Sequence, residues 1–261
     1  MAVSMSKRDL GVLEKIKDPE SNPAIGSLVD ESLPRDPNVL DDAIYERVSR
    51  QERGIVLAMQ DLESPLATAE VDASAELDEA YRKCVADLGS LIQETPEYAS
   101  ARNNRVQALR RLYGDHLLMA DAPKSSQALL PNPQPEQRPE AAMMALNDLD
   151  TAITLLSPRS LFAALSPTAS RTLSLAYTQR AAIYLATSKL VSSGSLHLRN
   201  GRREVGWTAI DFEEAASRDF AMGGRYGNEI AKGLAVSTNP TAKLCGQMVR
   251  EMMKKEYEAA Y

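Results

Sequence analysis

The sequence is poor in aromatic residues, and this shortage narrows the possible fold classes. Aromatic residues make up 5% of the 261 residues, with one Trp and three Phe. Ala and Leu dominate the apolar positions instead, which favours closely packed helices over a β-sandwich. Hydrophobic residues still make up 44% of the chain, so it can bury a core. Composition therefore predicts a helical globular protein.

The chain has only two cysteines, Cys84 and Cys245, which lie far apart in the sequence. Both fall on apolar helical stripes, so we predict two buried free thiols, and a disulfide or redox pair is the alternative. No run reaches the roughly 18 apolar residues of a membrane helix. The first residues, MAVSMSKRDLGVLEKIKD, lack the apolar centre of a signal peptide. We expect a cytoplasmic protein with no membrane partner.

A basic excess and the common catalytic motifs are also missing. The net charge of -6 argues against a nucleic-acid partner, which would require a basic surface. No GxSxG, phosphate loop or dinucleotide fingerprint occurs. His116 and His197 are the only histidines, we interpret both as solvated loop residues, and no Cys/His cluster suggests zinc. The sequence predicts a protein that is not an enzyme and needs no cofactor or metal.

Residues 1–45 have the composition of an N-terminal arm. The stretches DPESNP and LPRDPN are rich in turn-forming residues. Leu10, Leu13 and Ile16 can form one amphipathic face of a short helix. We predict that this arm is partly ordered by docking on the rest of the protein.

A repeated helical pattern begins near Val48. Helices starting near 46, 98 and 168 share an Arg, then a small or branched residue, then an apolar residue three positions later. The three instances are Arg53-Gly54 with Leu57, Arg105-Val106 with Leu109, and Arg180-Ala181 with Tyr184. A second helix follows each, with face positions spaced by four and then three residues. These positions are Cys84, Leu88, Leu91; Ala145, Leu149, Ala152; and Thr208, Phe212, Ala215. The pattern predicts three helical hairpins that stack on one another.

The predicted hairpins span about 46–97, 98–158 and 167–222, and capping helices follow over 223–261. Asn239 suits the N-cap of the last helix, and Pro240 suits its first turn. A stripe beginning at Cys245 lies on one face of that helix, and we expect its side chains to pack as the cap. The other stripe residues are Met248, Val249, Met252 and Met253.

Long connections separate the two helices of each hairpin, at about 61–75, 114–139 and 189–206. The middle connection contains five prolines and cannot be one continuous helix. In a stack of hairpins these connections lie along one edge. We interpret them as tolerated surface insertions, because long loops cost little free energy. A composite binding edge is the alternative.

Several motifs resemble known repeat proteins. The stretches ARNNRVQALRRLYGD and AYTQRAAIYLATSKL, with Pro96 closing the first unit, resemble tetratricopeptide repeats. A VLEKI segment within 12–23, an SAxNNRxQA helix at 100–108 and an NPxxxLCxxMxxxMM tail resemble the tetratricopeptide repeat protein 36 family. The tail positions are Asn239, Pro240, Leu244, Cys245, Met248, Met252 and Met253.

This resemblance implies an all-α tetratricopeptide-repeat solenoid of three helical hairpins with C-terminal capping helices. It also implies a non-enzymatic adaptor, linked to a heat-shock chaperone or to the regulation of tyrosine metabolism. The expected partner is a protein or peptide segment, with a heat-shock chaperone and a tyrosine-catabolism enzyme as the implied identities. The alternative function is a structural or stabilising subunit of a metabolic complex that makes contact through its loop insertions.

The first helices of such hairpins line a concave groove, where we place the candidate site. Asn104 would face the groove, and Arg105 would face the neighbouring helix. Amide side chains can both donate and accept, so they suit a peptide backbone, while Arg can hold a carboxylate. Arg at these positions can instead simply bridge helices. The candidate groove residues are Glu52, Asn103, Asn104, Arg105, Gln107, Gln179 and Arg180.

A carboxylate clamp of the chaperone-binding type is not predicted. The matching positions are Gln51, Ile55, Asn104, Leu175 and Gln179, and only Asn104 fits. Without cations such a clamp loses most of its charge-assisted bonds. Two basic stretches, Arg110-Arg111 and RNGRRE at 199–204, could contact an acidic partner, but solvated charge is the default interpretation.

Overall fold

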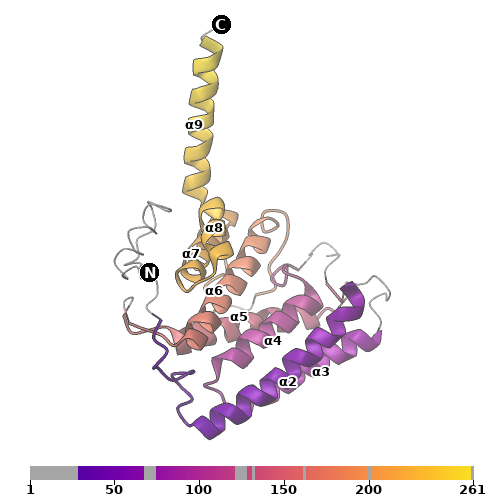
Figure 1. Ribbon diagram of the computed structural model, residues 1–261. Helices are drawn as coiled ribbons and strands as arrows, with labels where there is room; N and C mark the ends of the chain where they lie inside the picture. Colours follow the sequence, from indigo (N-terminus) through magenta and orange to yellow (C-terminus); the bar gives the residue numbers. More distant parts are fainter. Residues whose placement is uncertain are drawn as a thin grey trace, which may run out of the picture.

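The computed structural model describes residues 29–67, 75–120, 128–130, 133–160, 163–198 and 201–259. Within these ranges the protein is all-helical, with eight helices and no strand (Figure 1). The helices are α2 (Asp42–Ala67), α3 (Ala75–Glu94), α4 (Ala99–Tyr113), α5 (Gln137–Leu156), α6 (Pro167–Ser188), α7 (Ala209–Arg225), α8 (Glu229–Thr238) and α9 (Pro240–Ala259). The predicted amphipathic segment at 10–16 lies outside the described residues. The predicted all-α fold class is therefore confirmed.

Consecutive helices pack on one another, so the chain runs as a succession of helix pairs (Figure 1). α2, α4 and α6 correspond to the predicted first helices, and α3, α5 and α7 to the second ones. α2 and α6 also contact α4 directly. The first helices therefore form one continuous layer, in which polar residues of three helices can meet.

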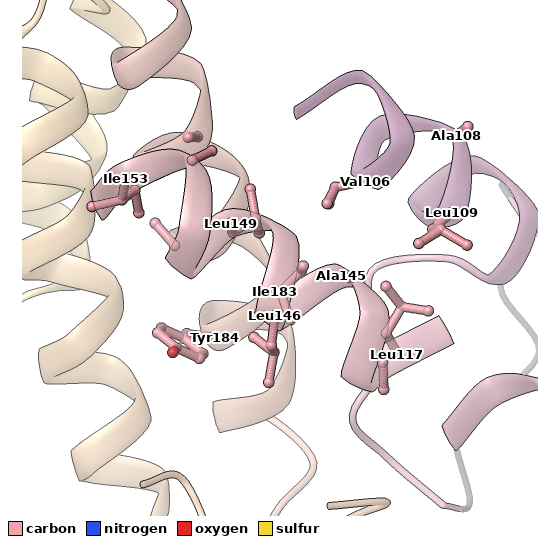
Figure 2. Packing of buried hydrophobic residues seen from close by; sticks show 14 of the residues in the cluster. Val106, Ala108, Leu109, Leu117, Ala145, Leu146, Leu149, Ile153, Ile183 and Tyr184 are labelled. Atoms are coloured by element: carbon pink, nitrogen blue, oxygen red, sulfur yellow. The ribbon is translucent and has the colours of Figure 1, made fainter. Parts of the chain in front are cut away.

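Two apolar clusters fill the space between the helices. The larger contains Leu146, Leu149 and Tyr184, and Figure 2 shows these side chains gathered with others from α4, α5 and α6. The smaller contains Val48 and Leu88, which join α2 to α3. The predicted second-helix face is buried at Cys84, Leu88, Leu91, Ala145, Leu149, Ala152, Phe212 and Ala215. The remaining predicted position, Thr208, was wrongly placed on this face, because it is the N-cap of α7.

Side-chain caps explain where several helices begin. The Ser166 side chain accepts the Ala169 N–H at the start of α6, and Thr208 and Asp211 form a reciprocal capping box on α7. Asn239 accepts the N–H groups of Thr241 and Ala242, as its predicted N-cap role requires. These short polar motifs fix the helix boundaries through contacts within one helical turn.

The described part of the predicted arm lies against α5 and α6. The Asp30 N–H donates to the Leu165 carbonyl at 2.9 Å, and the Asn38 amide donates to the Leu155 carbonyl at 2.9 Å. The Ser166 hydroxyl donates to the Arg35 carbonyl at 3.0 Å. These bonds connect positions more than a hundred residues apart and tie the segment before α2 to the middle of the chain.

The last two helices behave differently from each other. α8 packs closely on α7, where a Cβ added at Gly224 would lie 2.8 Å from the Lys232 Cα. Only glycine permits that approach. α9 extends away from the other helices (Figure 1), and its predicted packing stripe is exposed. Burial of Cys245 was therefore predicted wrongly, whereas Cys84 is buried. The reason is local: α9 begins two positions after α8 ends, so it cannot fold back.

No helix among the described residues is both long enough and apolar enough to cross a membrane.

Candidate functional site

The predicted amide residues join the first helices to one another. Glu52 of α2 is 7% exposed and accepts from the Asn104 amide at 2.7 Å and from the Tyr98 hydroxyl at 2.5 Å. The Gln179 amide of α6 donates to the Asn103 side-chain oxygen at 2.7 Å. We call Glu52, Tyr98, Asn103, Asn104 and Gln179 the amide ladder. It connects α2, α4 and α6 through bonds made within the protein.

Glu52 has no cationic partner in these bonds. Burial raises the pKa of the Glu52 carboxyl, and the bonds from Tyr98 and Asn104 only partly offset this effect. A buried carboxylate with neutral donors pays a desolvation cost that no opposite charge repays. The ladder therefore contains a carboxyl whose ionised form is disfavoured by burial, although its hydrogen bonds are satisfied.

Arg105 bridges two helices, as the helix-facing interpretation predicts. Its guanidinium holds Asp148 of α5 with two bonds of 2.7 Å, and the Asp148 side chain is 2% exposed. A Cβ added at Gly89 of α3 would lie 3.2 Å from the same guanidinium. Arg105 thus packs between α3 and α5. Arg53, at the matching position of α2, is exposed.

Arg180 lies in a larger buried arrangement that we call the ion cluster. Two of its nitrogens bond Asp219 of α7 at 2.7 and 2.8 Å, and a third bonds Asp150 of α5 at 2.7 Å. Arg202 bonds Asp150 at 2.9 Å, and both Arg202 and Arg203 bond Glu204. The members are Asp150, Arg180, Arg202, Arg203, Glu204 and Asp219. Three cations meet three carboxylates, so the formal charge is zero.

The ion cluster overturns the default interpretation of solvated charge for Arg202 and Glu204, whereas the Arg203 side chain is 53% exposed and residues 199–200 lie outside the described residues. The Glu204 side chain is fully buried, and it accepts from the Tyr184 hydroxyl at 2.6 Å. Burial alone would raise the pKa of Glu204, but the bonds from Arg202 and Tyr184 outweigh it and hold the pKa below the ordinary value. This network attaches the third connection to α5 and α6.

A cavity of about 910 Å³ opens beside the amide ladder. α2, α4, α6 and the segment after α4 line it, and its polar lining includes Glu63, Gln107, Arg110, Arg111, His116 and Lys189. Gln107 and Lys189 are exposed. Of the predicted groove residues, Gln107 is the one in this lining, while the rest take part in the bonds between helices described above.

Most charges in the cavity wall already have partners inside the protein. Arg111 holds Glu63 at 2.5 Å, and Arg110 holds Asp115 at 2.8 Å. Burial raises the pKa of Glu63, yet the bonds from Arg111 and Tyr81 lower it further, so the net shift is downward. The lining holds three permanent cations and two carboxylates, which leaves one positive charge.

His116 is partly buried in this wall, so its interpretation as a solvated residue was wrong. Burial lowers the pKa of its imidazole, with the Asp115 carboxylate acting in the opposite direction. Its Nδ1 is buried and has no hydrogen-bond partner within the described residues. Burial therefore favours the neutral form of this imidazole.

The second and third connections meet on one edge of the helix stack. Met119 and Leu196 form an antiparallel bridge, flanked by bonds from Ala120 to Ser195 at 2.8 Å and from His197 to Leu118 at 2.7 Å. The first connection lies partly outside the described residues.

Another cavity, of about 660 Å³, lies between α2 and α3 and includes Lys83 in its lining.

Sequence reasoning missed the acidic partners and the cationic end of the cavity. Asp148 precedes the predicted face residue Leu149 and Asp219 follows the predicted face residue Ala215 by four positions, so both occur on the helices predicted to pack. Lys189 and His116 carry no such signal. They lie 73 positions apart in the sequence, although both line the same cavity.

Comparison with known proteins finds a relative that aligns with nearly the whole chain. The chain is 33% identical to the L-tyrosine degradation gene cluster protein hmgX of Aspergillus fumigatus, over 98% of its own length and 94% of the relative's. No family model matches the chain, so its resemblance to the tetratricopeptide repeat protein 36 family is not confirmed. No solved structure matches it either.

Proposed function

Because the chain belongs to the family of the L-tyrosine degradation gene cluster protein hmgX, we propose that it is a non-catalytic accessory protein of L-tyrosine degradation. In this proposal it binds a protein partner, a tyrosine-catabolism enzyme, on the layer formed by α2, α4 and α6. The alignment supports a shared role, because it extends over nearly the full length of both proteins.

We further propose that the helix pairs are tetratricopeptide-like repeats. The succession α2–α3, α4–α5 and α6–α7 supports this, as does the alternation of first and second helices along one layer. In a stack of this kind each repeat contacts mainly its neighbours, and the layer of first helices serves as a binding surface. The carboxylate clamp of chaperone-binding repeats has no counterpart here, so we favour an enzyme over a heat-shock chaperone.

The observation that carries the proposed site is the cavity beside the amide ladder. The ladder residues bond one another, so they hold the helices rather than a partner. The cavity adjoining them has room for several side chains, with Gln107 and Lys189 exposed at its edge. An amide and a cation at one opening suit a peptide segment that carries a carboxylate.

Titration calorimetry with purified enzymes of L-tyrosine degradation from the same organism tests this site. We expect one of them to bind, and Lys189→Glu to weaken that binding at least about tenfold by replacing attraction with repulsion. Lys83→Glu makes the same charge change at the other cavity and should leave the affinity unchanged. Equal losses in both variants would show a general charge effect and exclude the proposed site.

A cellular experiment tests the metabolic role separately. Cells that lack the chain should consume L-tyrosine more slowly than cells that carry it, and reintroducing the wild-type chain should restore the rate. Reintroduced Lys189→Glu should restore it only in part. Unchanged L-tyrosine consumption in cells that lack the chain would contradict the proposed function.

The joined connections favour a second candidate function, a structural subunit that makes contact through its insertions. Their backbone bonds hold 118–120 and 195–197 together, with Leu118 and Met119 buried, and Val205 of the third connection is exposed. Val205→Glu would then disrupt binding of the enzyme partner, whereas Lys189→Glu would not. The two variants therefore distinguish the two surfaces in the same titration.

A further inference from the structure

The outer face of the first helix pair is open, whereas the matching faces of the next two pairs are covered. Gly54 of α2 is exposed, and a Cβ added there would meet no atom within 4 Å. The matching residues of α4 and α6, Val106 and Ala181, are fully buried. α4 packs on α3 and α6 packs on α5, so the second helix of the preceding pair covers each of them. Among the described residues no helix precedes α2, which lies at one end of the helix stack (Figure 1).

The open face forms one wall of the cavity of about 660 Å³ between α2 and α3, which we call the outer groove. Ile55, Ala58 and Leu62 line it from α2, and Cys84 and Leu91 line it from α3. These positions recur every three, four or seven residues, so the apolar lining follows one face of each helix. A groove of this kind suits the apolar face of an amphipathic helix.

The charges in the outer groove are predominantly acidic. Three carboxylates and one cation line it, which gives a net charge of -2, and they are Asp61, Asp87, Glu94 and Lys83. Glu94 pairs with Arg47 at 3.3 Å. Asp61 and Asp87 are exposed and have no ion-pair partner within the described residues. The groove therefore favours an occupant that combines an apolar face with a positive charge.

The N-terminal arm contains a segment with these properties. Residues 7–17 lie outside the described residues, and their sequence KRDLGVLEKIK has four basic and two acidic side chains, a net charge of +2. Leu10, Leu13 and Ile16 recur at helical spacing and form its apolar face. As a helix the segment is about 15 Å long, and the groove positions 51–62 of α2 extend over about 16 Å. Charge, apolar pattern and length therefore match the outer groove.

The described part of the arm begins within reach of the groove. Arg35 pairs with Glu46 of α2 at 2.7 Å, and the groove begins about 8 Å further along this helix, at Gln51. Asp30 lies at most about 17 Å from Arg35, because only five residue steps connect them. Including the ion pair, the path from Asp30 to Gln51 is at most about 40 Å, and residues 18–29 can span that distance when extended.

We propose that residues 7–17 of this chain form an amphipathic helix that docks in the outer groove. The segment then covers α2 as α3 covers α4 and as α5 covers α6. Its apolar face packs on α2 and α3, and its basic side chains meet Asp61 and Asp87. Such a helix caps the first end of the stack, as terminal elements of repeat proteins do. This proposal does not depend on the proposed function, whose cavity is lined by α2, α4 and α6.

Carbodiimide cross-linking of the dilute full-length wild-type chain tests the contact, because this reagent joins only a lysine and a carboxylate that touch. We expect peptide mapping to find Lys15 or Lys17 joined to Asp61 or Asp87. An equal mixture of unlabelled and isotope-labelled chains shows whether the arm belongs to the same molecule, in which case no mixed-label cross-link forms. Mixed-label cross-links would overturn the proposal in favour of a second copy. Absence of cross-links between arm and groove would overturn it and leave the groove to another protein.

Trypsin digestion compares two neighbouring substitutions, with cleavage after Lys15 and Lys17 followed by mass spectrometry. Ala58→Arg places a bulky cation in the groove, so it should speed this cleavage at least about tenfold by releasing the segment. Leu57→Arg adds the same charge at a side chain that is 51% exposed and outside the groove lining, and it should be cleaved like wild type. Circular dichroism checks that both variants keep their helix content. Cleavage of Ala58→Arg at the wild-type rate would overturn the proposal.

Discussion

The amide ladder and the ion cluster both bury a glutamate between helices, but they surround it with opposite chemistry. Glu52 accepts from a phenol and an amide, and its pKa is raised by burial. Glu204 accepts from Tyr184 and two arginines, and its pKa is lowered despite burial. Similar burial thus gives opposite shifts, because the charge of the partners decides whether ionisation is stabilised.

The difference assigns different roles to the two regions. The ion cluster compensates its charges fully and attaches a long irregular connection to the helices. The amide ladder keeps an uncompensated carboxylate between α2 and α4, next to the cavity that we propose as the binding site. Uncompensated buried charge costs stability, and such costs are found near functional surfaces.

The largest expected effect comes from breaking the compensation in the ion cluster. Glu204→Gln should lower the free energy of unfolding by about 3 kcal/mol, because it leaves the largely buried Arg202 with only the partly exposed Asp150 as counter-charge. Urea denaturation at pH 7 measures this change. A loss below about 0.5 kcal/mol would mean that the cluster is not electrostatically coupled in solution.

The same substitution in the amide ladder should have a much smaller effect. Glu52→Gln keeps the shape and removes a buried charge that has no cationic partner among the described residues, so the free energy of unfolding should change by less than about 1 kcal/mol, towards stabilisation. Denaturation under identical conditions provides the comparison with Glu204→Gln. A large loss here would show that the Glu52 charge is compensated after all.

The dependence on pH should separate the regions further. The favourable contribution of Glu52 is full below its ordinary pKa of 4.5 and is lost as pH rises through its raised pKa in the folded protein. That of Glu204 is full above 4.5 and is lost as pH falls through its lowered pKa. As pH rises from 4 to 7, the stability of Glu52→Gln relative to wild type should therefore increase. The stability of Glu204→Gln relative to wild type should decrease over the same range. Parallel curves would contradict the assigned shifts.

The last comparison concerns Arg105, whose guanidinium pairs with Asp148 of α5 and lies close to Gly89 of α3. Gly54→Ala adds a methyl group where nothing lies within 4 Å and should stabilise the protein by up to about 1 kcal/mol through helix propensity. Gly89→Ala brings the same propensity gain but places its Cβ 3.2 Å from the Arg105 guanidinium. We expect its net change to be near zero. Equal melting-temperature gains would show that Arg105 moves aside freely.

Local sequence patterns predicted the helices and their starting points well. The recurring Arg motif and the second-helix face correspond to elements that the structure shows, and Asn239 caps α9 as expected. These features depend on residues within one or two helical turns. The helix-bridging interpretation of Arg105 is likewise confirmed by its bonds to Asp148.

Features that depend on distant parts of the chain were not predictable in the same way. The partners of Arg180 come from α5 and α7, and Glu204 lies in a connection that composition marks only as basic and irregular. The exposure of α9 was missed for another reason. Its apolar stripe has the spacing of a packed helix, and periodicity does not tell whether the covering surface belongs to the same chain.

The ion cluster also determines how the third connection should open in solution. Irregular segments usually exchange their amide hydrogens through small local openings. Residues 202–207 include the fully buried Glu204 side chain and the N–H bond from Trp207 to the Glu204 carbonyl at 3.2 Å. Releasing them would break the ion pair between the fully buried Glu204 side chain and the largely buried Arg202 side chain. Their amides should therefore exchange together with those of α6 and α7, as one cooperative unit, although no helix or strand contains them.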